Sequence, residues 1–156
     1  ETKMVEQSGL ADCASVRMLE QVVPSILEFD RRVFGADREP VLRSLLNRGP
    51  QFCFVSQDAR EVRGYCFGRV GHNFTHIGPV VAEDFQTARQ VVSCALKNSL
   101  DRPVVIDAIH QSPEWVQWLG SIGFAEQRPL IRMYRGGNNY PGIPGKQFAI
   151  LGPEFG

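Results

Sequence analysis

The sequence lacks an excess of charge of either sign. Lys plus Arg and Asp plus Glu each number 17 among 156 residues, so the formal net charge is zero. Proteins that attract nucleic acid or anionic membranes through charge carry a basic excess, so we expect neither as a partner. Long apolar runs are also missing, because none approaches the roughly 18–20 residues that cross a bilayer.

Cysteine is scarce, and its spacing indicates no metal centre. The four cysteines lie far apart along the chain, without the short intervals that bind zinc: Cys13, Cys53, Cys66 and Cys94. Reduced, buried thiols are therefore the expected state. The first residues contain no apolar core of a signal peptide, so a cytoplasmic location is expected.

Length and composition fit one ordinary globular domain. Apolar residues make up 43% of the chain and charged residues 22%, which is enough apolar material for a single core at this length. We expect residues 1–14 to form an N-terminal tail or linker and residues 15–156 to form the domain. No internal repeat or low-complexity segment interrupts that domain.

Apolar periodicity predicts two helices followed by antiparallel strands. Apolar residues recur at helical spacing within residues 24–35 and again within residues 40–48. A short strand is expected before them, around residues 16–19. Three strand-like runs, separated by turn residues, come after them at 51–56, 62–70 and 74–82.

The second half of the chain predicts helices that alternate with strands. The expected elements are a helix at 85–98, a strand at 104–108, a helix at 113–122, a strand at 130–135 and a last strand at 147–151. A strand, a helix and a further strand favour parallel pairing through a right-handed crossover. The predicted fold class is α/β (an α+β mixed sheet), with a mixed, mostly antiparallel sheet flanked by helices.

The junction between the third strand-like run and the next helix is the most informative part of the chain. The strand stops at Ala82, and the helix begins just beyond Glu83 and Asp84. A helix N-terminus presents free backbone N–H groups, which attract a phosphate or another anion. The junction therefore has the backbone arrangement of a phosphate site.

Residues 77–96, which span this strand, loop and helix, resemble the acetyl-CoA-binding segment of the GNAT N-acetyltransferase superfamily. Trp118-Leu-Gly-Ser-Ile-Gly-Phe124 is similar to the helix end that follows later in the superfamily. The resemblance is closer to the C-terminal halves of tandem GNAT proteins. Those share a Gly-Pro-x-x-Ala-Glu-Asp turn at 78–84, an Arg-Met-x-Arg-Gly strand at 132–136, a tail at 149–154 and a first helix and turn at 29–38.

The resemblance implies where acetyl-CoA would bind. The backbone of Val80, Val81 and Ala82 would pair with the pantetheine arm where two parallel strands separate. The loop and first helical turn would hold the pyrophosphate through Phe85, Gln86, Thr87, Ala88 and Arg89. Both glycines of the superfamily's loop are missing, and Glu83 and Asp84 add negative charge. A plain strand–helix connection is therefore the alternative.

His76 and Asp107 are the catalytic candidates. The resemblance puts His76 where many members keep a glutamate that takes the proton of the amine, and imidazole titrates near neutral pH. Asp107 and His110 follow the next strand, near the end at which open sheets bind ligands. A solvated strand histidine and a turn aspartate are the structural alternatives. The superfamily's tyrosine acid is replaced by Leu119, and Tyr134 is the most plausible substitute.

The sequence thus predicts an acyl-CoA-dependent N-acyltransferase that acetylates a small-molecule amine by direct attack in a ternary complex. The missing glycines and Leu119 keep a second hypothesis open, a GNAT-shaped domain that has lost catalysis and serves as a binding, regulatory or structural module. A second GNAT domain or a second copy of the chain would be its protein partner. A Rossmann-type nucleotide site is disfavoured, because no Gly-x-Gly-x-x-Gly follows a strand.

Overall fold

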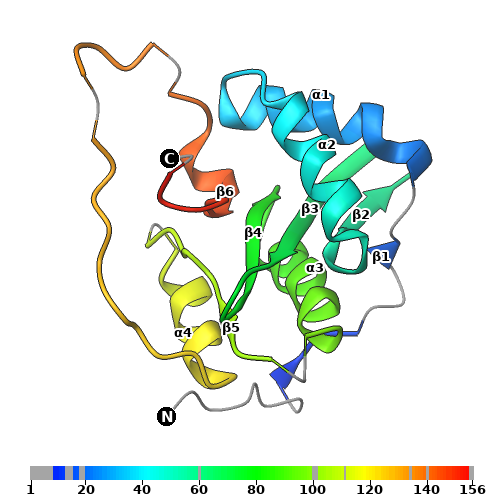
Figure 1. Cartoon of the computed structure of the whole chain (residues 1–156). Helices are drawn as coiled ribbons and strands as arrows, with labels where there is room; N and C mark the ends of the chain where they lie inside the picture. The colour runs from blue at the N-terminus through cyan, green and yellow to red at the C-terminus, as the bar shows by residue number, and fades with distance from the viewer. Residues whose placement is uncertain are drawn as a thin grey trace.

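The chain folds around a central sheet that is covered by two helices on each face. The structure, a computed structural model, describes residues 9–12, 16–17, 20–59, 61–99, 102–110, 112–133, 135–139 and 141–154. Helices α1 (Val23–Phe34) and α2 (Glu39–Arg48) cover one face of the sheet, as Figure 1 shows. Helices α3 (Phe85–Lys97) and α4 (Pro113–Ser121) cover the other. The predicted fold class is confirmed.

The sheet contains six strands within the described residues. They are β1 (Val16–Arg17), β2 (Phe54–Asp58), β3 (Glu61–Val70), β4 (Thr75–Ala82), β5 (Val104–Val105) and β6 (Gln147–Ala149). Strands β1 to β4 are antiparallel neighbours in chain order, and β5 lies parallel to β4. Strand β6 also pairs with β4, antiparallel and outside that order.

The pairing follows from the connections between strands. Short turns link β2 to β3 and β3 to β4, and both pairs are antiparallel. The crossover through α3 instead brings β5 parallel to β4, as the strand–helix–strand pattern predicted. The strand expected at 51–56 starts only at Phe54, because Pro50–Phe52 form a 3₁₀ turn that buries Phe52. Every described helix is too short or too polar to span a bilayer.

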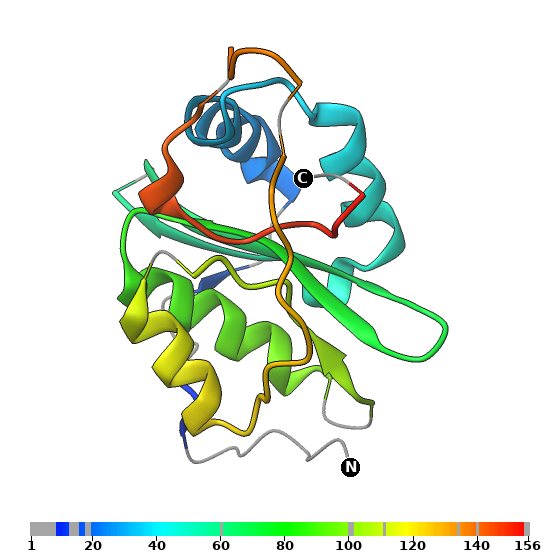
Figure 2. The same cartoon turned by 90° about the vertical axis from the view of Figure 1, so that its left-hand side faces the viewer.

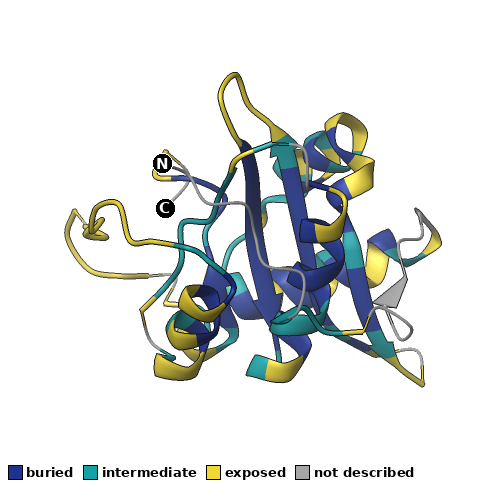
Figure 3. Cartoon of the chain, turned by 90° about the horizontal axis from the view of Figure 1, so that it is seen from below, coloured by how far each residue is buried: buried dark blue, intermediate teal, exposed yellow. Residues whose placement is uncertain are grey.

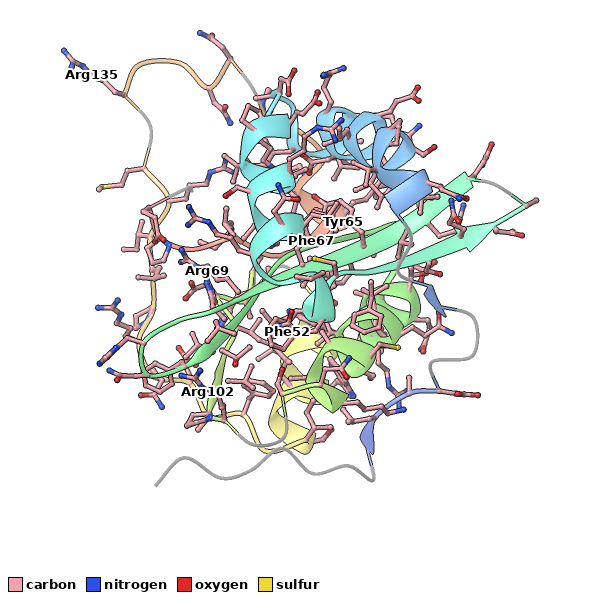
Figure 4. All side chains as sticks on the ribbon, turned by 45° about the vertical axis from the view of Figure 1, so that its right-hand side comes forward. Phe52, Tyr65, Phe67, Arg69, Arg102 and Arg135 are labelled. Atoms are coloured by element: carbon pink, nitrogen blue, oxygen red, sulfur yellow. The ribbon has the colours of Figure 1, made fainter. Side chains whose placement is uncertain are left out.

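Two apolar clusters hold the sheet between its helices. Tyr65 and Phe67 of β3 point toward α1 and α2, and Figure 4 shows them between β3 and α2. The alternate residue Cys66 points to the opposite face, because successive side chains of a strand leave on opposite sides. Trp115 and Trp118 of α4 are buried there beside α3.

A buried polar cluster joins α1, the turn after it and β3. Arg38 donates hydrogen bonds to both carboxylate oxygens of Asp30, at 2.9 and 2.7 Å, and another to the Tyr65 hydroxyl at 3.2 Å. Tyr65 donates its own hydroxyl hydrogen to Asp30. The guanidinium also lies 3.8 Å from the ring centroid of Phe34. Burial raises the pKa of Tyr65 well above its ordinary value, so the phenol stays protonated. The cluster is stable because each charge has a partner.

The strand predicted at 130–135 is not found in the described part of that stretch, which corrects the sequence-based expectation. Residues 124–133, which we call the arm, contain no strand, and Ile131 and Met133 are 84% and 85% exposed. Figure 3 shows the arm as an exposed loop beside the sheet. Strand β5 is the last strand in the order β1 to β5, and none of the described strands pairs with the arm. The arm therefore has the apolar pattern of a strand but no neighbouring strand to bond with. Tyr134 lies outside the described residues.

Cys94 takes part in a disulfide, which corrects the expectation of four reduced thiols. The spacing of cysteines along a chain cannot reveal a pairing that only folding creates. Cys53 and Cys66 are buried free thiols, as expected, and burial raises the pKa of Cys53 to about 12. Cys13 lies outside the described residues.

Residues 9–12 lie against the helices on the α3–α4 side of the sheet. The backbone N–H of Ala11 donates to the hydroxyl of Ser93 at 2.9 Å. The indole N–H of Trp118 donates to the carbonyl of Gly9 at 3.2 Å. This part of the segment that precedes the predicted domain therefore packs on the domain itself.

Replacing Asp30 with Ala should strongly destabilise the fold. Asp30 is 1% exposed, and its loss leaves the buried charge of Arg38 without its ion-pair partner. Breaking a buried ion pair in this way costs about 3–5 kcal/mol of unfolding free energy. Urea unfolding followed by circular dichroism measures the loss. Arg43→Ala, which breaks an exposed ion pair with Glu39 on α2, is the control and should change stability little. Equal losses in the two variants would contradict the role of the buried cluster.

Candidate functional site

Strands β4 and β5 separate soon after they meet. Their parallel pairing joins His76 to Val105 and goes no further, so the two strands form a fork beyond that point. Strand β6 enters the fork between them. Ala149 of β6 faces Val80 of β4 on one side and Ala108, just after β5, on the other. The last strand that the sequence predicted is therefore present, and it fills the opening between the two parallel strands.

Backbone hydrogen bonds hold β6 on the β5 side of the fork. The N–H of Ile109 donates to the carbonyl of Phe148 at 2.9 Å, and the N–H of Ile150 donates to the carbonyl of Asp107 at 3.0 Å. On its other side β6 pairs with β4, which is buried along its whole length. Buried backbone groups need partners, and β6 supplies them. Figure 2 shows β6 in the layer of the sheet, between the two pairs of helices.

The segment before β6 is anchored on the end of α1. The N–H of Ile143 and the side-chain amide of Gln147 both donate to the carbonyl of Val33, at 2.7 and 3.2 Å. Gly142 has a φ of +60°, and a Cβ there would lie 2.5 Å from the same carbonyl, so the close approach requires glycine. These contacts fix the chain just before it enters the fork.

His76 and Asp107, the two catalytic candidates, meet at the base of the fork. Nε2 of His76 lies 3.0 Å from Oδ2 of Asp107, without the alignment of a full hydrogen bond. The side chains are 11% and 19% exposed, so the carboxylate is the more open of the two groups. The two residues that sequence reasoning proposed separately thus share one place in the structure.

Arg69 and Glu154 extend this pair into a chain of polar contacts. Two nitrogens of Arg69 lie 3.4 Å from Nδ1 of His76, and Arg69 also donates to Glu154 at 2.7 Å. Arginine has only donors, so Nδ1 must accept, and we assign the proton of the neutral imidazole to Nε2, which faces Asp107. Burial lowers the pKa of His76; the charge of Asp107 opposes this shift and that of Arg69 adds to it. His76 is therefore neutral at pH 7.

A large hollow opens beside the pair. Its volume is about 2210 Å³, and His76 and Asp107 form part of its wall together with β5 and the arm. Arg69 and Arg102 also line it, and Figure 4 shows both near the end of the β3–β4 hairpin. Pockets for small ligands usually measure about 300–1,000 Å³, so the hollow is wide enough for more than one reactant. The Asp107 carboxylate can therefore be reached from this side.

The loop that was expected to hold a pyrophosphate is capped by the chain itself. The side chain of Asp84 accepts a hydrogen bond from the N–H of Thr87 at 2.8 Å, so a carboxylate lies at the N-terminus of α3. Ala88 is completely buried, and Thr87 is nearly so. Arg89 donates to the carbonyl of Gly9 at 3.3 Å. Negative charge at this helix end favours the helix dipole and opposes a phosphate.

The other residues predicted to bind the cofactor are mostly occupied as well. Val80, Val81 and Ala82 are buried, and the strand they form has β3 on one side and β6 on the other. Phe85 packs edge-on against Trp118, with ring centroids 6.5 Å apart. Among these candidates, only Gln86 is exposed.

These contacts do not fit acetyl-CoA in the fork while β6 is there. The edge of β4 that a pantetheine arm would use is paired with β6. Phe148 and Leu151 are 4% and 2% exposed, and burying a side chain of this size contributes about 1.5–3 kcal/mol. Removing residues 147–151 therefore costs about 3–6 kcal/mol. A ligand that had to displace them would lose roughly 10²–10⁴-fold in apparent affinity.

Other residues considered from the sequence are not placed to take part in a reaction. Leu119, at the position of the superfamily's tyrosine acid, is buried in the core and carries no proton to donate. His110, named with Asp107 above, is exposed, as is His72 in the turn before β4. The described residues contain no group of three ligands able to hold a metal ion. Arg69 and Glu154 were missed. Arg69 faces His76 across the β3–β4 pair, in a register that the sequence left open, and Glu154 lies far from His76 along the chain. The local signal for Arg69 was its place in β3, where alternate side chains leave on the same face of the sheet.

The fold and the fork define a class of protein. An antiparallel run of strands, followed by a parallel pair that separates before a helix N-terminus, is the architecture of the acyl-CoA N-acyltransferases. The family described as "Acetyltransferase (GNAT) domain" matches residues 26–149. The chain belongs to this family.

Solved structures share the fold at low sequence identity. TTHA1254 from Thermus thermophilus is 14% identical, with a TM-score of 0.59 over 80% of this chain and 98% of that one. A point mutant of the same Thermus protein gives 18% identity and a TM-score of 0.55, with the same shares of the two chains covered. An acetyltransferase candidate from Agrobacterium tumefaciens gives 14% identity and a TM-score of 0.52, over 78% of this chain and 99% of that one. No curated protein matches the chain.

The stability of the fold should fall as the pH drops through the range in which histidine titrates. Folding lowers the pKa of His76, so below about pH 6.5 the unfolded chain binds a proton that the folded chain does not. The contribution of His76 is fully present above that pH and is lost toward the lower folded pKa. Urea unfolding between about pH 7.5 and pH 5.5 measures it. His76→Gln should flatten this dependence relative to the wild type and to a His72→Gln control. Identical slopes in all three proteins would contradict the assignment.

Proposed function

We propose that this chain is an acyl-CoA-dependent N-acyltransferase that transfers an acetyl group to a small-molecule amine by direct attack in a ternary complex. The observation that carries the proposal is the His76–Asp107 pair at the base of the fork, open to the hollow on one side. Membership in the GNAT acetyltransferase family supports acyl transfer as the class of reaction. Acetyl-CoA, once bound, would supply the activated acyl group.

Asp107 is the group proposed to accept the proton of the amine. An amine nitrogen loses a proton when it forms an amide bond, and the carboxylate is the more exposed member of the pair. His76 would orient that carboxylate through Nε2–H, and Arg69 would hold the imidazole in the required tautomer through Nδ1. A positioned base of this kind contributes about 10²–10⁴-fold to the rate. If His76 were itself the base, Nε2 would have to lose its proton and Nδ1 would have to carry one against Arg69.

A second candidate function is that of a non-catalytic partner module. The observation that favours it is β6 in the fork, because the buried side chains of this segment oppose its displacement. The carboxylate of Asp84 at the N-terminus of α3 acts in the same direction. In this case the His76–Asp107 pair would contribute to the packing of the sheet, and a second GNAT domain or a second copy of the chain would be the partner.

Asp107→Asn should lower kcat by about 100-fold or more, because the amide cannot accept the proton of the amine. Release of free thiol from acetyl-CoA, measured with a panel of small amines, gives the rate. Binding of coenzyme A, measured by calorimetry, should be unchanged. Asp58→Asn, which changes an exposed carboxylate at the end of β2, is the control. An unchanged kcat in the Asp107 variant would remove this residue from the mechanism.

A thermal melt with excess acetyl-CoA should distinguish the two candidate functions. A ligand at about 100 times its dissociation constant adds about 2.7 kcal/mol to stability, which raises the midpoint of a domain of this size by several degrees. The enzyme predicts such a shift with acetyl-CoA and with coenzyme A, and none with ATP. The partner module predicts no shift with any of the three.

A further inference from the structure

Strand β6 and a pantetheine arm need the same backbone groups. In the fork, β4 offers its free edge beyond His76, and Val80 and Val81 of that edge are paired with β6. On the opposite side, backbone hydrogen bonds join residues 107–109 to residues 148–150. Two occupants of different origin therefore cannot lie in the fork together.

We propose that β6 is an intramolecular competitor of acyl-CoA, so that the acyl donor enters the fork only when residues 147–151 leave it. The inference rests on the proposed function, because it presumes that the fork is the site of acyl transfer. It assigns to the C-terminal segment a regulatory role at that site. The domain with β6 in place is then the closed form of the enzyme.

Further contacts that hold the closed form lie outside the fork. The segment before β6 is fixed on α1 by the Val33 carbonyl and by the close approach of Gly142. Nζ of Lys146 also lies 2.5 Å from Oε2 of Glu83. Glu83 belongs to the loop at which an anionic ligand would arrive, so a phosphate there would compete for the charge of Lys146. Substitutions at these anchors can therefore make the release of β6 easier or harder without changing His76 or Asp107.

Glycine substitutions in this segment give a matched test. A Cβ at Gly142 would meet the carbonyls of Val33 and Phe34 at 2.5 and 2.6 Å, whereas a Cβ at Gly145 has no atom within 4 Å. Gly142→Ala should therefore loosen β6 and raise the affinity for coenzyme A about tenfold over the wild type. Gly145→Ala should bind as the wild type does. Calorimetry with coenzyme A measures both affinities.

Hydrogen exchange identifies which segment leaves. When coenzyme A is added, peptides that cover residues 147–151 should lose protection. Peptides that cover β4 should keep it, because the pantetheine arm replaces β6 as the hydrogen-bonding partner of the β4 edge. Protection of residues 147–151 that survives saturation with coenzyme A would overturn the proposal. The proposed function could still hold in that case, with the acyl donor outside the fork.

A covalent lock gives the converse test and does not depend on loosening the fold. Ala108 and Ala149 face each other, and the flanking bonds from Ile109 to Phe148 and from Ile150 to Asp107 make them a non-hydrogen-bonded pair. Such pairs have Cα atoms about 4.5 Å apart, within the range of a disulfide. Oxidised Ala108→Cys/Ala149→Cys protein should not bind coenzyme A, and reductant should restore binding, with equally treated wild type as the control.

The outcomes separate the two proposals. Binding to the locked protein at wild-type affinity, or no gain in Gly142→Ala, overturns the competition. Competition together with no turnover on any amine would leave the closed form supported and the acyltransferase rejected. If neither the wild type nor Gly142→Ala binds coenzyme A, competition does not explain the exclusion, and both proposals fail.

Discussion

The structure depends on one requirement, that β4 be hydrogen-bonded along both edges. All eight residues of β4 are buried, so neither edge can use water. Strand β3 satisfies one edge, but β5 pairs with the other over only two positions. Something else must cover the remainder, and β6 does so. The position of the C-terminal segment, its anchors on α1 and the closed fork all follow from this unpaired stretch of backbone.

The first half of the fold was predictable because its signals are local. Apolar spacing located α1 and α2, and strand-like runs bounded by turn residues located β3 and β4 to within a residue or two. The resemblance at residues 29–38 now has a physical basis, since Asp30 and Arg38 form the buried pair with Tyr65. The arm and β6 were harder, because a strand forms only where another strand offers an edge. Residues 130–133 have the apolar pattern of a strand, but no described strand offers them a free edge to pair with. Strand β6 pairs with the edge of β4, a partner that the order of the strands along the chain did not suggest.

The candidate site divides in the same way. His76 was proposed from the resemblance and Asp107 from its place after the next strand. The short parallel pairing of β4 with β5, which puts His76 opposite Val105, brings the two side chains together. Arg69 lies beside His76 because of the register of the β3–β4 hairpin, which the sequence left open, and Glu154 reaches Arg69 only through a contact across the fold. The cap formed by Asp84 could have been anticipated, since aspartate before a helix is the usual N-cap residue. The sequence allowed a phosphate site or a plain strand–helix connection at the N-terminus of α3. In the structure the side chain of Asp84 accepts the hydrogen bond there that a phosphate would accept.

The packing around β6 has an optical consequence. Both tryptophans of the chain lie in one stack, with ring centroids 5.2 Å apart, and Phe148 packs edge-on against Trp115 at 5.5 Å. Indole emission responds to the polarity and packing around the ring, and no tryptophan elsewhere dilutes the signal. Departure of β6 would remove Phe148 from this stack and admit water or another ligand beside it. The intrinsic fluorescence of the protein therefore reports, without any label, whether the chain's own strand lies in the fork.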